Sequence, residues 1–215
     1  MALLAGTHLR VIDTETSGMS PGRSDLVEVS SVRIEDGNVA EGWCSLVQPR
    51  RRIPPDATRV HGITDDMVRD APPPRAVAAT LREELGDHPL VFHNAAFDLP
   101  FLRVLMRDHG QAPLYNPVLD TLGLARAWDP SGSHGLGRMA DKMGVPRRER
   151  HRALPDAITT AQLLILLAER FERERNVHSF WELAALSQDA ARLPRPAAVP
   201  QTGGEPVRMD DASRV

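Results

Sequence analysis

Cysteine is nearly absent from this 215-residue chain, in which Cys44 is the only one. A single cysteine excludes a disulfide within the chain and any zinc cluster built from cysteines. Long apolar runs are missing too, since LLILLA at residues 163–168 is far too short to span a bilayer. The opening residues MALLAG lack a basic region and a long apolar core, so we expect no signal peptide and a cytoplasmic protein without membrane contact.

Positive charge is not in excess either. The chain has 26 lysines and arginines against 29 acidic residues, a formal net charge of −3, and Lys142 is its only lysine. Because this overall charge does not attract a polyanion, binding to nucleic acid would need local patches or metal ions. The sequence also contains no internal repeat and no Walker-type glycine loop.

What is present fits a folded α/β domain, with 41% hydrophobic and 26% charged residues. Apolar runs predict strands over residues 8–13, 26–34 and 38–47, the last two joined by the hairpin turn EDGN. We expect the proline-rich connection over 49–67 to be irregular. Helices are predicted over 72–87, 95–110, 136–143 and 155–175, with short strands at 89–94 and 117–120. This order predicts a mixed five-stranded sheet, an antiparallel three-strand meander plus two parallel strands, flanked by helices.

The C-terminal part differs in composition. We expect residues 1–175 to form the main domain and residues 176–193 to contain one more helix, in FWELAALSQDAARL. Residues 194–215 are poor in large apolar side chains and cannot bury enough surface to order themselves, so they predict a disordered tail.

Two carboxylates, Asp13 and Glu15, follow the first predicted strand. Strand side chains alternate between faces, so these two point the same way. At about 5 Å apart they repel each other by roughly 3 kcal/mol at an effective dielectric constant near 20. Taken alone, the pair fits an ordinary strand end that faces water.

Two further aspartates stand where a helix meets a loop. Asp98 follows the strand at 89–94, and Asp156 is expected in the first turn of a helix that begins at Pro155, with His151 in the loop before it. Each aspartate alone fits a carboxylate at a helix N-terminus. Gathered at one edge of an α/β sheet, the four acids carry a charge of −4, which two divalent cations such as Mg²⁺ would balance.

Three segments, DTETSG, HNAAFD and HRALPDA, resemble the motifs of the DEDDh family of 3′→5′ exonucleases. That family is related to the proofreading epsilon subunit of bacterial DNA polymerase III and has a ribonuclease H-like fold. RVHGITDDM resembles its nucleotide-contacting loop, and LDTLGLAR resembles the strand and helix after the second motif. The likeness covers residues 9–171. It departs at Ser17 and Pro155, where many relatives have threonine and an aliphatic residue.

The resemblance implies roles for individual residues. His151 would be the general base, and two divalent cations, Mg²⁺ or Mn²⁺, would be held by Asp13, Glu15, Asp98 and Asp156. The terminal nucleotide would contact Thr14, Thr16, Asp56, His61 and Phe97. Taken alone, His61 better fits a loop histidine, and the surrounding HGIT favours the substrate contact. Phe97 equally fits the core face of a helix.

The resemblance also implies a reaction, namely hydrolysis of terminal phosphodiesters of single-stranded DNA to nucleoside 5′-monophosphates in proofreading or repair. The partner would be a single-stranded 3′ end, DNA favoured over RNA, with a DNA polymerase subunit as a further partner. An exoribonuclease remains open because the metal chemistry does not involve the 2′-hydroxyl. The alternative that is not an enzyme is a non-catalytic module that docks on a polymerase. The arginines of PRRERHR, residues 146–152, fit either phosphate contacts or a solvated surface.

Overall fold

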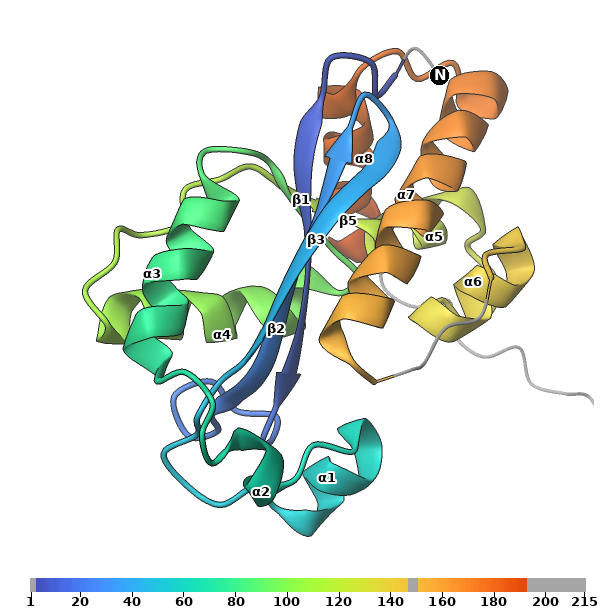
Figure 1. Ribbon diagram of the computed structural model, residues 1–215. Helices are drawn as coiled ribbons and strands as arrows, with labels where there is room; N and C mark the ends of the chain where they lie inside the picture. Colours follow the sequence, from blue (N-terminus) through green and yellow to red (C-terminus); the bar gives the residue numbers. More distant parts are fainter. Residues whose placement is uncertain (1–2, 147–150, 193–215) are drawn as a thin grey trace, which may run out of the picture.

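The computed structural model describes residues 3–146 and 151–192, in which helices cover both faces of a central sheet (Figure 1). The strands are β1 (His8–Thr16), β2 (Leu26–Glu35), β3 (Asn38–Leu46), β4 (Leu90–Phe92) and β5 (Val118–Asp120). The helices are α1 (Pro55–His61), α2 (Asp65–Val68), α3 (Pro74–Leu85), α4 (Ala95–Asp108), α5 (Thr121–Trp128), α6 (Leu136–Met143), α7 (Ala153–Arg175) and α8 (Phe180–Arg192).

The five strands are ordered β3-β2-β1-β4-β5, which places β1 in the middle of the sheet. β1 to β3 form the antiparallel meander, and β4 and β5 continue the sheet parallel to β1. The predicted mixed sheet and its ribonuclease H-like arrangement are therefore confirmed. Because β1, β4 and β5 run in parallel, their carboxyl ends meet at one edge, where loops and helix starts converge.

Alternate residues of β1 supply two separate cores. Leu9 and Val11 pack in the larger core, beneath α5, α7 and α8. Ile12 belongs to the core beneath α3 and α4. Figure 1 shows these two groups of helices on opposite sides of the sheet. The period-two alternation of β1 thus determines which helices each later residue of the strand meets.

The predictions for residues 49–67 and for the start of α7 were wrong. The connection over residues 49–67 is not irregular throughout, since it contains α1 and α2, and a proline at the first helical position suits α1. α7 begins at Ala153 rather than at Pro155, which occupies the third helical position, where no intrahelical N–H donor is needed. Pro100 lies in the second turn of α4, and the helix continues through it.

A helix at the predicted C-terminal position, α8, packs against α5 and β5 and buries Phe180 and Leu183. The approach to α5 is close, since a Cβ at Gly123 would lie 1.7 Å from the carbonyl oxygen of Ser187. The proposed tail, residues 194–215, lies outside the described residues. Among the helices described, we find none with the length and apolar character that a membrane crossing requires.

Candidate metal centre and active site

The first two acids of the site lie on the face of β1 that α7 covers. Asp13 and Glu15 continue the alternation of Leu9 and Val11, so they point toward the side where α7 packs. β1 extends to Thr16, beyond the predicted end at residue 13, so both carboxylates lie within the strand. Their cross-strand neighbours on β2, Ser30 and Glu28, therefore fix their backbone positions.

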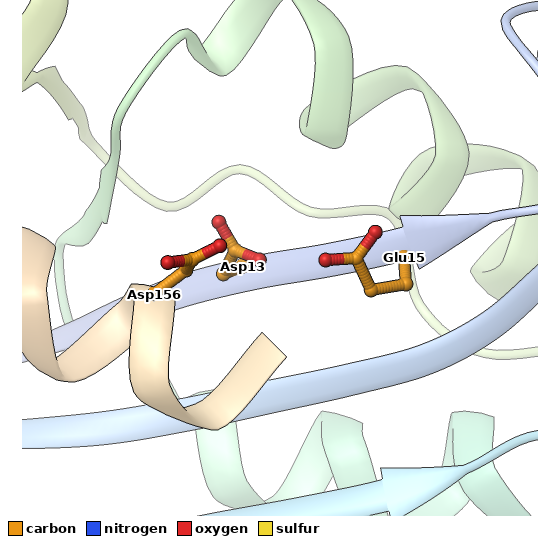
Figure 2. A group of neighbouring side chains, drawn as sticks. All are labelled: Asp13, Glu15 and Asp156. Atoms are coloured by element: carbon orange, nitrogen blue, oxygen red, sulfur yellow. The ribbon is translucent and has the colours of Figure 1, made fainter. Parts of the chain in front are cut away.

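Asp156 meets these two acids from the first turn of α7. One carboxylate oxygen each of Asp13, Glu15 and Asp156 lies within 4.8 Å of the others (Figure 2). Oxygen donors at such mutual distances fit hard divalent cations, which take carboxylate ligands at about 2.0–2.6 Å. The donor set thus fits the cations predicted from the sequence, although it does not distinguish Mg²⁺ from Mn²⁺.

Electrostatics explain why a cation belongs here. Burial, and then the charges of Asp98 and Asp156, raise the pKa of Asp13 well above its usual range. Burial, and then the charge of Asp156, raise the pKa of Glu15 to about 8. Both shifts mean that the protein disfavours negative charge at this point unless a positive charge is supplied.

Asp98, the fourth predicted ligand, approaches β1 from the first turn of α4. Its Oδ1 accepts hydrogen bonds from the backbone N–H of Thr14 at 3.1 Å and from the Thr14 hydroxyl at 2.6 Å. Burial raises the pKa of Asp98 to about 7, and the hydrogen bonds from Thr14 oppose this shift. Asp98 is thus held next to the three clustered acids, although it lies outside the group whose oxygens are within 4.8 Å.

The turn that delivers Asp98 is anchored by Asp120 at the end of β5. Asn94 precedes α4 in a left-handed conformation, with φ of 85°. The Asp120 carboxylate accepts hydrogen bonds from the backbone N–H groups of Asn94, Ala95 and Leu122, at 2.8, 3.1 and 2.9 Å. One side chain thus joins the starts of α4 and α5 behind the acids.

His151 lies two residues before α7, in a left-handed conformation with φ of 59°. Its backbone N–H donates a hydrogen bond of 2.9 Å to Oδ2 of Asp156. The side chain is exposed and borders a cavity of about 280 Å³ that Asp156 and Thr159 also line. His151 and Asp156 therefore border the same cavity at the start of α7.

The model of an exonuclease family, RNase_T, matches residues 11–164. Two similar proteins are PolC-type DNA polymerases III, one from Bacillus cereus and one from Clostridium perfringens. The first is 34% identical over 197 residues, which cover 91% of this chain and 14% of the polymerase. The second is 34% identical over 169 residues, which cover 78% and 12%.

The chain belongs to this exonuclease family. The predicted DEDDh-type 3′→5′ exonuclease family and the predicted class of enzyme are therefore confirmed. The chain spans only about an eighth of the length of the PolC-type relatives, so the other activities of those polymerases do not transfer with the match.

Solved structures give the same family and fold. A structure of Exonuclease X in complex with 5′ overhanging duplex DNA is 29% identical, with a TM-score of 0.65 over 83% of this chain and 99% of that chain. Escherichia coli Exonuclease I in complex with a dT13 oligonucleotide is 21% identical, with a TM-score of 0.71 over 79% and 43%. At that identity, the second likeness shows the fold alone.

Of the residues predicted to contact the terminal nucleotide in this exonuclease domain, His61 is the most deeply placed. It ends α1, is 4% exposed, and its Nδ1 accepts a hydrogen bond of 3.0 Å from the backbone N–H of Ile63. Its Nε2 is buried and has no hydrogen-bond partner within the described residues. Burial lowers the pKa of His61, and the neighbouring Thr16 backbone opposes the shift.

The other predicted contacts occupy three settings. Thr14 and Thr16 are buried on β1, and the Thr16 hydroxyl donates a hydrogen bond to the Gly18 carbonyl at 2.8 Å. Phe97 is half-buried against Phe101, with ring centroids 5.4 Å apart. Asp56 is exposed on α1 and pairs with Arg59. Residues 147–150, which hold most of the arginine-rich loop, lie outside the described residues.

Glu28 is an acid of this site that was not predicted from the sequence. This residue is the cross-strand partner of Glu15 in the register of β1 and β2, and it is 1% exposed. A signal was available, since an acid interrupts the apolar run at the start of the second strand, LVEVSSV. An alternating pattern shows on which face a residue lies, but it does not show which later segment that residue contacts.

Proposed function

We propose that this chain hydrolyses the 3′-terminal phosphodiester of single-stranded DNA and releases nucleoside 5′-monophosphates. The observation that carries the proposal is the convergence of Asp13, Glu15 and Asp156 within 4.8 Å beside His151. The structures of Exonuclease X and Exonuclease I with DNA support DNA as the substrate. The similarity to PolC-type polymerases supports a role in proofreading or repair and a polymerase partner. We also propose that the protein is cytoplasmic.

In the proposed reaction, Asp13, Glu15, Asp98 and Asp156 would hold two divalent cations, Mg²⁺ or Mn²⁺. Bound cations supply positive charge that lowers the pKa of the attacking water and offsets the charge that builds on the phosphate. The neutral imidazole of His151 accepts the proton of that water. The water oxygen bonds to phosphorus, the bond to the 3′ oxygen of the preceding nucleotide breaks, and the terminal nucleotide leaves with its 5′-phosphate.

Substrate binding is proposed for the residues that surround the end of β1. Thr14 and Thr16 are proposed to contact the terminal nucleotide through their hydroxyl oxygens, which can accept a hydrogen bond while their protons are donated to Asp98 and Gly18. The Nε2 of His61 is proposed to contact the terminal sugar. Phe97, which precedes Asp98 in the sequence, is proposed to pack against the last base. Asp56 is the remaining proposed contact, on the exposed surface of α1.

The test uses 5′-labelled single-stranded DNA and a matched RNA in Mg²⁺ or Mn²⁺. We expect a ladder of DNA products that shortens from the 3′ end, with activity abolished by EDTA. Asp13→Asn should lower kcat about 100-fold or more, since it removes charge that holds the cations. The control Asp87→Asn changes an acid whose side chain is fully exposed and should act like wild type. Internal cleavage, or activity in EDTA, would contradict the proposal, and preference for RNA would indicate an exoribonuclease.

A further inference from the structure

Glu28 places a further negative charge beside a cluster that already repels anions. It lies opposite Glu15 in the strand pair, its side chain is 2% exposed, and its charge contributes to the raised pKa of Glu15. A buried carboxylate without a partner destabilises a fold by several kcal/mol. The reason for keeping an acid at this position must therefore be found in its contacts.

Both oxygens of Glu28 are used by the first residues of α7. Oε1 accepts from Nη2 of Arg152 at 2.6 Å, and the Arg152 Nε lies 3.2 and 3.1 Å from Oε1 and Oε2. Oε2 also accepts from the backbone N–H of Ala153 at 2.8 Å. Such a forked, charge-assisted contact restricts both distance and orientation. Glu28 thus faces the start of α7 and is not part of the group of three acids.

The next inward-facing residue of β2 completes the attachment. The hydroxyl of Ser30 donates a hydrogen bond of 2.8 Å to the carbonyl oxygen of Ala153. Arg152, at the N-cap position of α7, makes no capping hydrogen bond with its side chain. Instead, the carboxylate of Glu28, 125 residues earlier in the sequence, accepts the hydrogen bond from the first backbone N–H of the helix. Both backbone polar groups of Ala153 are therefore bound to β2.

This attachment lies between the two groups that α7 brings to the site. His151 comes one residue before Arg152, and Asp156 comes three residues after Ala153. The hydrogen bond from the His151 backbone to Asp156 links the two ends. Because β2 also pairs with β1, a single strand sets the start of α7 relative to Asp13 and Glu15. A displacement of Arg152 and Ala153 would move the base and a metal ligand together.

We propose that Glu28 and Arg152 are positioning residues that hold His151 and Asp156 in register with the acids of β1. The inference rests on the proposed function and adds two residues to it. Arg152 is one of the arginines that the sequence offered for phosphate contacts, and its guanidinium instead binds Glu28. Partners of metal ligands typically change metal affinity or activity 10- to 100-fold when they are removed. We expect losses of metal affinity and activity of that size when either residue of this pair is changed.

Two variants with opposite charge changes provide the test. Glu28→Gln removes a negative charge near the cluster, and Arg152→Gln removes a positive one. If the pair acted only through its electric field, the two variants would change Mn²⁺ affinity in opposite directions. As positioning residues, both should lower kcat about 10- to 100-fold and weaken Mn²⁺ binding, with KM for single-stranded DNA within about threefold of wild type.

Mn²⁺ affinity is measured by isothermal titration calorimetry and kcat with the 5′-labelled oligonucleotide. In the double variant, the losses of kcat and Mn²⁺ affinity should be no larger than those of the more impaired single variant, because each change removes the same contact. Arg152→Lys keeps the charge without the fork and should recover part of the loss. The control Arg33→Gln breaks the pair with Glu84 at the other end of β2, 3.3 Å apart, and should leave both values unchanged.

Three results would overturn the inference. These are opposite shifts of Mn²⁺ affinity, additive losses in the double variant, or a lower melting temperature with unchanged kcat and Mn²⁺ affinity. If wild type itself has no exonuclease activity, the proposed function fails, and the direction of the Mn²⁺ shifts still decides the positioning role. If Glu28→Gln does not fold, Arg152→Lys and Arg152→Gln are compared with wild type, and equal Mn²⁺ affinities would overturn the inference.

Discussion

At the scale of single residues, the clustered acids oppose the folding of the metal-free protein. Glu15 has a pKa raised to about 8, so the folded state holds a proton that the unfolded state releases near pH 4.5. Between these values the folded state binds more protons than the unfolded state, and stability falls as pH rises. Metal binding requires the deprotonated carboxylates, so metal affinity rises with pH over the same range.

The raised pKa of Glu15 predicts that the stability of the protein depends on pH. Without metal, the melting temperature should fall between about pH 5 and pH 8, and Glu15→Gln should flatten that fall because glutamine does not titrate. Added Mn²⁺ should restore stability in wild type at pH 8 and do so much less in the variant. Scanning calorimetry with and without EDTA measures both effects. A metal-free melting temperature that rises toward pH 8 would contradict the expected direction.

His151 is the second single-residue case. His151→Gln keeps a polar side chain but removes the proton acceptor, so kcat should fall about 100- to 1,000-fold with little change in KM. Mn²⁺ affinity should remain near wild type, since His151 is not among the proposed ligands. The control His109→Gln changes a histidine at the C-terminal end of α4 and should retain full activity. Near-normal turnover by His151→Gln would rule out its role as the base.

At the scale of elements, local patterns predicted what local contacts determine. The alternation of residues 9–15 predicted that Asp13 and Glu15 share a face, and the antiparallel hairpin and parallel strands formed as expected. The starts of α1 and α7 were predicted less well. α7 begins early because Glu28, far away in sequence, accepts the Ala153 N–H, and no pattern around residue 153 reveals that contact.

The packing of α8 on α5 gives a prediction at this scale. Gly123→Ala would place a methyl group 1.7 Å from the Ser187 carbonyl oxygen, so the two helices must separate. We expect a loss of about 1–3 kcal/mol in the free energy of unfolding, measured by urea denaturation. Gly135→Ala meets no atom within 4 Å and should cost much less. Equal stabilities for the two variants would show that α8 does not sit against α5.

At the scale of the whole molecule, the question is how much of the chain folds as one unit. The predicted boundary at residue 175 separates α8 from the remainder, whereas Phe180 and Leu183 are buried in the same core as α7. Truncation after residue 175 should therefore lower the melting temperature by at least about 5 °C, since burial of each large apolar side chain contributes about 1.5–3 kcal/mol. Truncation after residue 192 is the matched control and should melt like the full chain. If the shorter protein is equally stable, the boundary at 175 holds.

The whole molecule also shows what a sequence can tell about a site. Three acids separated by up to 143 positions were assigned together because their motifs match a family, and the structure places them within 4.8 Å. Glu28 lies outside those motifs, and its pairing with Arg152 depends on how β2 is placed against α7. Contacts of this kind follow from the assembled fold rather than from any local stretch.

The single cysteine has a practical consequence. Cys44 is exposed on β3, and loss of hydration around its sulfur and then the nearby Glu28 carboxylate raise the pKa of its thiol to about 12. At neutral pH little of the protein then carries the thiolate, the form that attacks alkylating reagents and peroxides. Covalent dimers should accumulate slowly in air, and maleimide dyes should label the native protein poorly. Faster labelling after Glu28→Gln would report, through chemistry unrelated to nuclease activity, on the charge next to α7.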